Sequence, residues 1–534
     1  MAANGVNRIS RRKFVKGAAA GAAGIAAGSM LPTNVFAGAA TMSRPNIIFL
    51  MTDQQRWDCS GALNPHIKTP NLDRLARQGI LFRQAVCHAP MCVPSRYAMM
   101  LGLYPSQIGV YTNADSLPDD RLPATPLPEI LRRAGYQTAG FGKTHWRQAI
   151  PSTRGFEVRS SDESRTSCNY EAGSLTMSDD NPQGLKDYFA EVASYGPGEE
   201  GVQGYIGCVS KVPARNHRDG WIAGQCLTFL DKGVDPQRPL FLYLSFIKPH
   251  AGFNVPKEFE DLYDIATIPD TPQPPWHDEP DTHLAAYDAD PSSGTRYPEW
   301  RAAWEKMTPM DRRRTTLRYC ANCSWLDAYF GQVLEKLQKM GRLDNALIVF
   351  TSDHGEMLGE RNFRFSKYCL YDSSVRVPLI LSGSVIPESK RGTVDNRPAE
   401  HVDLVPTLAR FAGTPVAAVL PGMDLLGNRL HAGSFSEFHG GAPHVAPMYM
   451  WRTAEWKLIL FLPGRLDGPA AQTLQTKGEL YHLTDDPHEW KNLYADENHS
   501  AVREQMKTAL LMHLACTWSR GPVVPEPLGR AKKA

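Results

Sequence analysis

Short, continuous apolar runs punctuate the chain, and each one is followed by polar residues. A run of this kind is typical of a strand that is buried on both faces of a sheet. The expected strands are Pro45–Met51, Tyr136–Phe141, Pro239–Phe246, Ala346–Phe350 and Val377–Leu381. Apolar positions recur at helical spacing between them, over Pro70–Gln78, Leu127–Ala134 and Asp311–Met340. The alternation predicts an α/β fold, a large and mostly parallel sheet with helices on both faces.

The pattern changes near residue 426. Short alternating runs at Met448–Thr453, Trp456–Phe461 and Glu479–Leu483 predict an antiparallel sheet, and a helix is expected over His499–Ala515. The predicted organisation is therefore a large α/β domain over residues 44–425 and a small α+β C-terminal domain over 426–534. Two polar stretches, 160–213 and 268–300, are expected to be long surface loops that form functional walls.

Residues 1–39 have the features of an export signal. Arg11 and Arg12 precede a weakly apolar run rich in alanine and glycine, and small residues near Ala37 offer a cleavage site. This resembles a bacterial twin-arginine signal, so we expect export by the Tat translocase to the periplasm or the medium. The alternative is a basic start that arose by chance. The run is too weakly apolar for a permanent membrane span, and no later stretch offers about 20 consecutive apolar residues.

Composition and charge limit the function classes. The chain has 534 residues, 42% of them hydrophobic, and a formal net charge of +2. Such a balance does not indicate a nucleic-acid partner, and an anionic substrate would have to be met by local cations. The ten cysteines show no regular spacing, so no disulfide framework is expected. We interpret Cys320 and Cys323 as packing residues on a helix, with a redox or metal pair as the weaker alternative.

Polar residues gather where the predicted strands end. In an open parallel sheet these ends meet at one edge, which is where ligands bind. The residues concerned are Asp53, Gln54, Lys143, His145, His250, Asp353 and His354. Two carboxylates, an amide oxygen and an imidazole form a plausible divalent-metal site, with Ca²⁺ expected and Mn²⁺ or Mg²⁺ as alternatives. Taken singly, Asp53 could be a helix cap and Asp353 part of a strand-ending turn.

One segment, Cys92-Val93-Pro94-Ser95-Arg96, places a thiol at a helix start. Pro94 is tolerated in the first helical turn, and Cys92 would then lie at the positive end of the helix dipole. The simpler interpretation is a buried or capping cysteine.

These motifs, in this order, resemble the type I (formylglycine-dependent) sulfatases of the alkaline phosphatase superfamily over nearly the whole mature chain. The most specific match is the C-x-P-S-R core at Cys92–Arg96. The further matches are Asp53-Gln54, Gly142–His145, Lys248–His250, Asp353–Gly355, Lys367, Arg376–Pro378 and Glu479–Glu489. Three positions differ from the residues that the family usually has. Leu101 stands where threonine is usual, Gln54 where aspartate is common, and His354 where asparagine is common. The Lys248–His250 context looks faintly closest to the iduronate-2-sulfatase-like branch.

The resemblance implies a mechanism. Cys92 would be oxidised to formylglycine (3-oxoalanine) by a formylglycine-generating or anaerobic sulfatase-maturating enzyme. One hydroxyl of its hydrate would attack the sulfur of a sulfate ester, and deprotonation of the other would expel inorganic sulfate. Asp53, Gln54, Cys92, Asp353 and His354 would surround the metal. Arg96, Lys143 and Lys367 would stabilise charge.

His250 is the favoured acid for the leaving alcohol, with His145 near the formylglycine hydroxyl. A packed histidine and a solvated lysine are the simpler interpretations of His145 and Lys367. Aromatic residues in the polar stretch 268–300 favour a sulfated carbohydrate over a simple aryl sulfate: Trp276, Tyr287, Tyr297 and Trp300. The alternatives are a phosphonate monoester or phosphodiester hydrolase with the same site, and a non-catalytic binding protein for sulfated glycans.

Overall fold

A nine-stranded sheet forms the centre of the computed structural model, with strand order β5-β4-β3-β6-β1-β7-β8-β2-β9. β8 is antiparallel to both of its neighbours, β7 and β2, and the other neighbouring pairs are parallel. The strands are β1 (Asn46–Asp53), β2 (Ile80–Val86), β3 (Gln137–Gly142), β4 (Val158–Ser161), β5 (Leu175–Thr176), β6 (Leu240–Pro249), β7 (Ala346–Ser352), β8 (Leu379–Ser382) and β9 (Thr393–Glu400). The structure describes residues 44–146, 150–161, 171–194, 207–289, 293, 295–416, 420–428, 431–440, 447–461 and 477–518.

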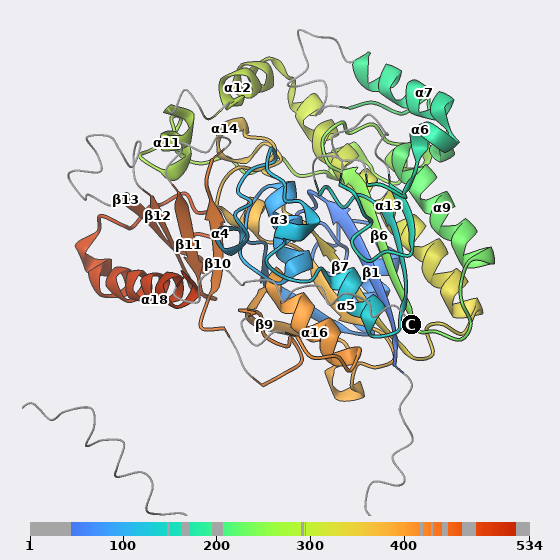
Figure 1. Cartoon of the computed structure of the whole chain (residues 1–534). Helices are drawn as coiled ribbons and strands as arrows, with labels where there is room; N and C mark the ends of the chain where they lie inside the picture. Colours follow the sequence, from blue (N-terminus) through green and yellow to red (C-terminus); the bar gives the residue numbers. More distant parts are fainter. Residues whose placement is uncertain are drawn as a thin grey trace, which may run out of the picture. The chain divides into compact units, whose positions relative to one another are not determined.

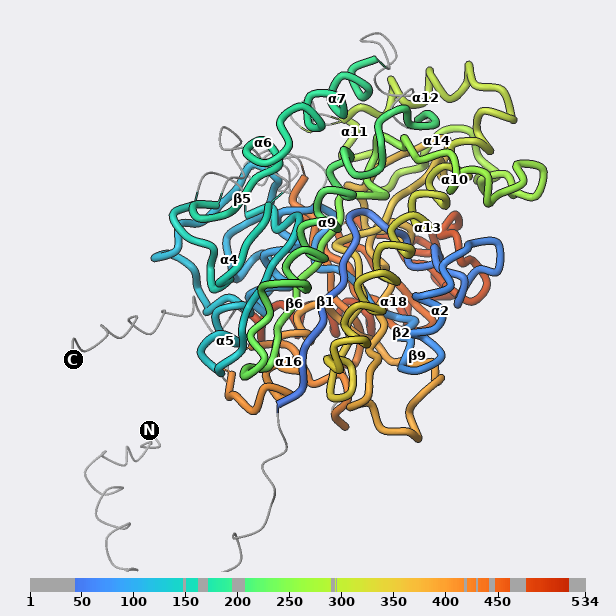
Figure 2. The backbone as a smooth tube through the Cα atoms, turned by 90° about the vertical axis from the view of Figure 1, so that its right-hand side faces the viewer, coloured from blue at the N-terminus to red at the C-terminus, as the bar shows by residue number. Residues whose placement is uncertain are grey.

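Helices cover both faces of this sheet (Figures 1 and 2). They are α2 (Pro70–Arg77), α3 (Cys92–Leu101), α4 (Pro105–Ile108), α5 (Leu127–Arg133), α6 (Met177–Asp180), α7 (Pro182–Ala193), α9 (Arg218–Lys232), α10 (Lys257–Glu260), α11 (His283–Ala289), α12 (Tyr297–Lys306), α13 (Pro309–Lys339), α14 (Glu360–Phe363), α15 (Asp372–Val375), α16 (Leu404–Phe411) and α18 (Ser500–Trp518). Within the described ranges, no helix combines the length and the hydropathy that a bilayer span requires.

The strand β1 shows why the sheet is buried on both faces. Ile47 and Phe49 belong to one core with residues of α3, α5 and α16. Ile48 and Leu50 point the other way, into a second core with residues of α2, α9 and α13. Figure 2 faces this second layer, where α9 and α13 run in front of β1 and β6. Alternate side chains enter opposite cores, so the strand needs an unbroken apolar run.

A second, antiparallel sheet lies near the end of the chain. It has the order β10-β11-β12-β13, with β10 (Ser434–Phe438), β11 (Met448–Arg452), β12 (Trp456–Phe461) and β13 (Lys477–His482). The helix α18 packs on it through Met506, Leu510 and Leu514. The two sheets and their helices confirm the predicted fold class. The boundary between residues 425 and 426 stays a prediction, and the predicted signal over 1–39 lies outside the described residues.

Two expectations about surface loops need correction. The stretch 160–213 contains α7, which begins at Pro182 after Asn181 caps it by accepting the Gly184 N–H at 3.0 Å. The stretch 268–300 contains α11 and the start of α12. These helices are short and partly exposed, so their apolar periodicity is weak and the sequence did not reveal them.

Candidate active site

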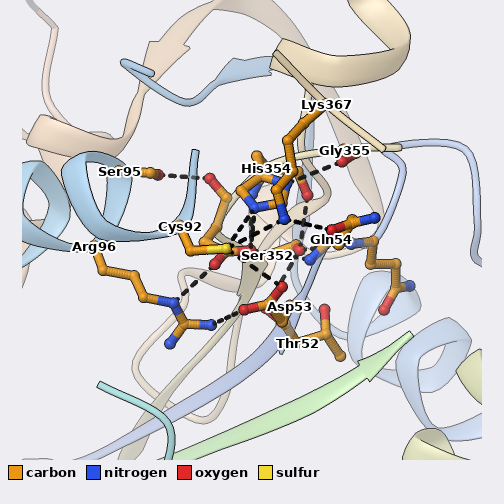
Figure 3. Close-up of polar contacts among 12 residues, drawn as sticks. Thr52, Asp53, Gln54, Cys92, Ser95, Arg96, Ser352, His354, Gly355 and Lys367 are labelled. Atoms are coloured by element: carbon orange, nitrogen blue, oxygen red, sulfur yellow. Dashed lines mark hydrogen bonds and ion pairs between the residues drawn. The ribbon is translucent and has the colours of Figure 1, made fainter. Parts of the chain in front are cut away.

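The helix α3 begins at Cys92, as predicted, at the carboxyl edge of the large sheet. All ten of its residues are buried, and the helix packs against α4, α5 and α16. The Cys92 thiol occupies the position where a formylglycine would stand. Its sulfur lies 3.2 Å from His354 Nε2 and 3.3 Å from Lys367 Nζ (Figure 3). The thiol therefore lies in the middle of a charged cluster and does not merely pack against apolar side chains.

Two carboxylates stand side by side beneath Cys92. Thr52 pairs with Ser352 in the parallel β1–β7 ladder, so Asp53 and Asp353 leave adjacent strands at the same level. The guanidinium of Arg96 donates to both, from Nη2 to Asp53 Oδ2 at 3.0 Å and from Nε to Asp353 Oδ2 at 2.8 Å. The Oδ1 atom of Asp53 therefore faces the cluster without competing for Arg96, whereas Asp353 Oδ1 also accepts the backbone N–H groups of Gln54 and His354 at 2.9 and 3.0 Å.

The pKa of Asp53 is lowered although burial raises it. Lys143 is one cause, since its Nζ donates to Asp53 Oδ2 at 2.6 Å. The Cys92 thiol shows the same pattern. Burial raises its pKa, but Lys143, Lys367 and His354 lower it well below its usual value. The site therefore favours negative charge at the Cys92 position.

The imidazole of His354 is oriented to offer a free lone pair. Its Nδ1 lies 2.9 Å from the Gly355 carbonyl oxygen, which can only accept, so Nδ1 carries the proton. Asp353 raises the pKa of His354 against the effect of burial; in the neutral form of the imidazole, Nε2 is an acceptor directed at the cluster. One potential ligand atom from each of Asp53, Cys92, Asp353 and His354 lies within 4.8 Å of the others. Two carboxylates and a correctly oriented imidazole fit a divalent cation.

The side-chain amide of Gln54 supplies a further oxygen to this cluster. Its backbone has φ +65°, a strained value for a residue other than glycine. Its Nε2 donates to the Glu356 carboxylate, and its Oε1 accepts from Lys367 Nζ at 2.6 Å. The Lys367 ammonium can only donate, so it fixes the amide oxygen toward the site, and Glu356, whose pKa burial raises to about 7, accepts from the amide nitrogen. Sequence reasoning missed Glu356, although its place directly after the Asp353–Gly355 motif was a usable signal.

Two histidines border Cys92 from neighbouring strand ends. His250 follows β6 and is half-buried, and burial together with Lys367 lowers its pKa to about 4, although a hydrogen bond with Cys92 opposes this. His145 follows β3, where burial and Lys143 lower its pKa. The Nδ1 atom of His145 is buried and has no hydrogen-bond partner among the residues that the structure describes. Both imidazoles therefore lie beside the Cys92 thiol, where they can exchange protons with a group at that position.

Lys367 lies on a strained segment that the antiparallel sheet supports. Six residues other than glycine between 358 and 368 have positive φ: Leu358, Arg361, Asn362, Phe363, Ser366 and Tyr368. The segment is held by Glu479 of β13, whose Oε2 accepts from Tyr371 at 2.8 Å. Its Oε1 accepts from His283 Nδ1 at 2.7 Å, and His283 Nε2 accepts the Leu370 N–H at 2.9 Å. Such backbone strain persists because these contacts fix the conformation.

A cavity of about 510 Å³ opens beside His250 and Lys367. Tyr287 and Trp300 line it, as the aromatic pattern predicted. Trp276 and Tyr297 do not line it: the Trp276 indole donates to the Trp490 carbonyl oxygen, and Arg364 covers the Tyr297 ring. The described part of 160–213 contributes no lining residue, so only the second predicted wall is found here.

Comparison with known families and proteins agrees with this geometry. A family model described as Sulfatase matches residues 45–414, and one described as N-sulphoglucosamine sulphohydrolase, C-terminal, matches residues 359–515. The choline-sulfatase of Rhizobium meliloti is 29% identical over 497 residues, covering 90% of this chain and 88% of that protein. The N-acetylglucosamine-6-O-sulfatase of Bacteroides thetaiotaomicron is 26% identical over 509 residues, covering 88% and 86%.

Solved structures share the fold. The phosphonate monoester hydrolase of Agrobacterium radiobacter superposes with a TM-score of 0.67 at 23% identity, covering 89% of this chain and 96% of that one. A structure in complex with D-glucosamine-2-N,6-O-disulfate gives a TM-score of 0.65 at 22% identity, covering 91% and 100%.

Proposed function

The chain belongs to the sulfatase family, and from that premise we propose that it hydrolyses a sulfate ester of a carbohydrate to an alcohol and inorganic sulfate. It is a sulfuric ester hydrolase, as the family and its sulfatase relatives show. The observation that carries the proposal is the Cys92 sulfur at the start of α3, 3.2 Å from His354 and 3.3 Å from Lys367.

The functional form of Cys92 in this proposal is formylglycine. A thiolate that attacked sulfur would be left sulfonated with no simple route of release. The formylglycine hydrate supplies one hydroxyl as the nucleophile and a second one whose deprotonation releases sulfate. Covalent catalysis of this kind divides one difficult step into two easier ones.

Asp53, Gln54, Asp353 and His354 would hold a divalent cation next to residue 92, and their mostly hard oxygen ligands favour Ca²⁺. When bound, such an ion neutralises sulfate oxygens and lowers the pKa of a coordinated hydroxyl. Arg96 anchors both carboxylates through one oxygen each, so their other oxygens stay directed at the site.

The remaining polar groups provide charge stabilisation and proton transfer. The ammonium groups of Lys143 and Lys367 face the position of the reacting group, where preorganised positive charge stabilises the transferring sulfate. His250 lies at the mouth of the cavity and is the proposed acid for the leaving alcohol. His145 would then exchange protons with the hydroxyls of residue 92.

The cavity supports a saccharide substrate. Its volume of about 510 Å³ suits a sugar unit, and Tyr287 and Trp300 contribute aromatic side chains to its lining. Asn113, Thr295 and Arg296 supply polar groups along the same wall. Relatives named for their activity on sulfated sugars, among them the N-acetylglucosamine-6-O-sulfatase, support this class.

Export and maturation complete the proposal. The twin-arginine pattern at Arg11 and Arg12 would direct the enzyme through the Tat translocase to the periplasm or medium. A formylglycine-generating or anaerobic maturating enzyme would have to modify Cys92 before α3 is buried, because the whole helix is inaccessible in the folded chain.

The modification can be tested by mass spectrometry of the tryptic peptide Gln84–Arg96 from protein made in its native host. Formylglycine replaces the sulfur of Cys92 by oxygen with loss of two hydrogens. Cys87 in the same peptide is the internal control, because it should remain a thiol. An intact thiol at residue 92 in active enzyme would contradict the proposal.

The substrate class requires a separate experiment. Sulfate release from a panel of defined sulfated saccharides is compared with turnover of aryl sulfates, phosphodiesters and phosphonate monoesters that share one leaving group. We expect the highest kcat/KM on a saccharide sulfate. A preference for phosphonate or phosphodiester substrates would favour the alternative hydrolase, and activity on small alkyl or aryl sulfates alone would exclude the saccharide.

A further inference from the structure

Three buried cysteines meet behind the proposed metal site. Cys59 lies in the loop after β1, and Cys320 and Cys323 lie on α13, with exposed fractions of 5%, 3% and 1%. All three are free thiols in the structure. Cys59 and Cys323 belong to one apolar cluster with Phe253 and Tyr319, and both helix cysteines lie close enough to the Cys59 thiol to lower its pKa. Isolated buried cysteines simply pack against apolar neighbours, whereas Cys59 shares its surroundings with two thiols of α13.

The loop that carries Cys59 also carries Gln54. Tyr319, the residue before Cys320, donates its hydroxyl to the Gln54 carbonyl oxygen at 2.6 Å. The same hydroxyl accepts the Arg56 N–H at 2.9 Å. Cys59 then closes a turn by donating its N–H to the Arg56 carbonyl oxygen at 3.1 Å. The helix α13 therefore holds this loop at Tyr319 and again at the cysteines.

Helix geometry decides which cysteines can pair. Cys320 and Cys323 are three residues apart, and the Cβ atoms of such helical neighbours are about 5–6 Å apart. A disulfide requires Cβ atoms about 3.5–4.5 Å apart. The two helix cysteines cannot bridge each other while α13 is intact. Any disulfide in the cluster must include Cys59.

We propose that Cys59 forms a disulfide with Cys320 or Cys323, and that this bond ties the Gln54 loop covalently to α13. The inference goes beyond the hydrolytic function and holds whatever the substrate. It would give Cys320 and Cys323 a role beyond the packing that the structure shows for them.

The chemistry is thiol–disulfide exchange with a disulfide oxidant. The Cys59 thiolate attacks one sulfur of the oxidant and releases its other half as a thiolate. The thiol of Cys320 or Cys323 then loses its proton and attacks the Cys59 sulfur, which releases the second half. Two protein thiols become one disulfide, and the oxidant is reduced to two thiols.

The acidity of the cluster suits this order of attack. Hydrogen bonds from Cys320 and Cys323 lower the pKa of Cys59 to about 6, against the effect of burial. The pKa values of Cys320 and Cys323 are raised, so these two stay protonated as donors. Cys59 is thus the thiolate that reacts first.

The test is a non-reducing peptide map of the full-length enzyme. Samples treated with oxidised glutathione or with dithiothreitol are blocked with iodoacetamide in denaturant and digested with trypsin. In the oxidised sample we expect the peptide Trp57–Lys68 to be cross-linked to Tyr319–Lys336, which contains both helix cysteines. Free Cys59 after oxidation, Cys59 joined only to glutathione, or a Cys320–Cys323 bridge would each overturn the proposal. This map needs no variant, so a folding defect cannot obscure it.

Variants then test the structural role of the bond. The oxidised enzyme should unfold a few degrees higher than the reduced one, because the bond restricts the unfolded chain. Cys59→Ser should remove this redox difference, and Cys226→Ser, at a lone buried thiol on α9, should retain it. If the bridge forms but the unfolding temperature does not respond, the bond does not secure the loop. Turnover is measured separately, so a failure of the proposed hydrolytic function does not affect either result.

Discussion

Replacing Glu479 with glutamine tests how the antiparallel sheet holds the segment that carries Lys367. Glu479 is fully buried on β13 and accepts hydrogen bonds from His283, Tyr371 and Tyr481. Burial opposes its ionisation, but His283 and these hydrogen bonds lower its pKa from 4.5 to about 2. At about 1.4 kcal/mol per pH unit, the ionised carboxylate contributes about 3 kcal/mol to the free energy of unfolding at neutral pH.

The sign of the pH dependence follows from the lowered pKa. A carboxyl group that is more acidic in the folded state stabilises the protein above its unfolded pKa, and the contribution is lost as pH falls through the folded pKa. The contribution of Glu479 should therefore be complete above about pH 5 and decline toward pH 2. Glu479→Gln lacks the ionisable group and should not show this decline.

Urea denaturation followed by tryptophan fluorescence measures the difference. We expect Glu479→Gln to be about 3 kcal/mol less stable than the wild type at pH 7, and about 1 kcal/mol less stable at pH 3. Glu455→Gln, an exposed substitution in the turn between β11 and β12, is the matched control and should stay within about 0.5 kcal/mol of the wild type. If the free energy of unfolding of Glu479→Gln is less than about 1 kcal/mol below that of the wild type at pH 7, the role assigned to the ionised carboxylate is refuted. The same holds if the difference between the two proteins is equal at pH 7 and pH 3.

Further predictions concern the site itself. Glu356→Ala should raise the Ca²⁺ dissociation constant about 10–100-fold in calorimetric titration, because the Gln54 amide loses the acceptor that orients it; an unchanged constant would show that Gln54 needs no such support. His250→Ala should lower kcat about 10²–10⁴-fold on saccharide sulfates but much less on 4-nitrophenyl sulfate, whose leaving group needs no proton; equal losses on both would remove His250 from the acid role. Treatment with EDTA should abolish turnover and lower the unfolding temperature, and Ca²⁺ should restore both; full activity after verified metal removal would contradict the metal site.

The sequence predicted best where one physical constraint dominates. β1, β3, β6 and β7 are buried on both faces, so their apolar runs are continuous and their ends are sharp. β2 was missed because Arg83 and Gln84 interrupt its apolar run and face partly toward solvent. β9 is a polar edge strand that contains Pro398, so it lacks the usual strand pattern.

The candidate site was predictable for a related reason. Parallel strands bring their ends to one edge, so Asp53, Lys143, His250 and Asp353 could be grouped without coordinates. The supporting residues could not, since Glu356, Glu479 and the cysteine cluster act through contacts between segments far apart in the chain. Glu479 lies 196 residues from His283, and no local pattern specifies that pairing.

The dependence of Lys367 on the antiparallel sheet has a consequence for the order of events during synthesis. Glu479 and Glu489, which accept from Tyr371 and from the Asp372 N–H, are translated long after Lys367. Until they leave the ribosome, the hydrogen bonds that fix Tyr371 and the Asp372 N–H, just after the strained segment, cannot form. The contacts of Glu479 and Glu489 that support the Lys367 segment beside α3 are therefore completed only when translation is nearly finished. If Cys92 is converted to formylglycine as proposed, that delay leaves time for the maturation enzyme to reach it before folding closes the site.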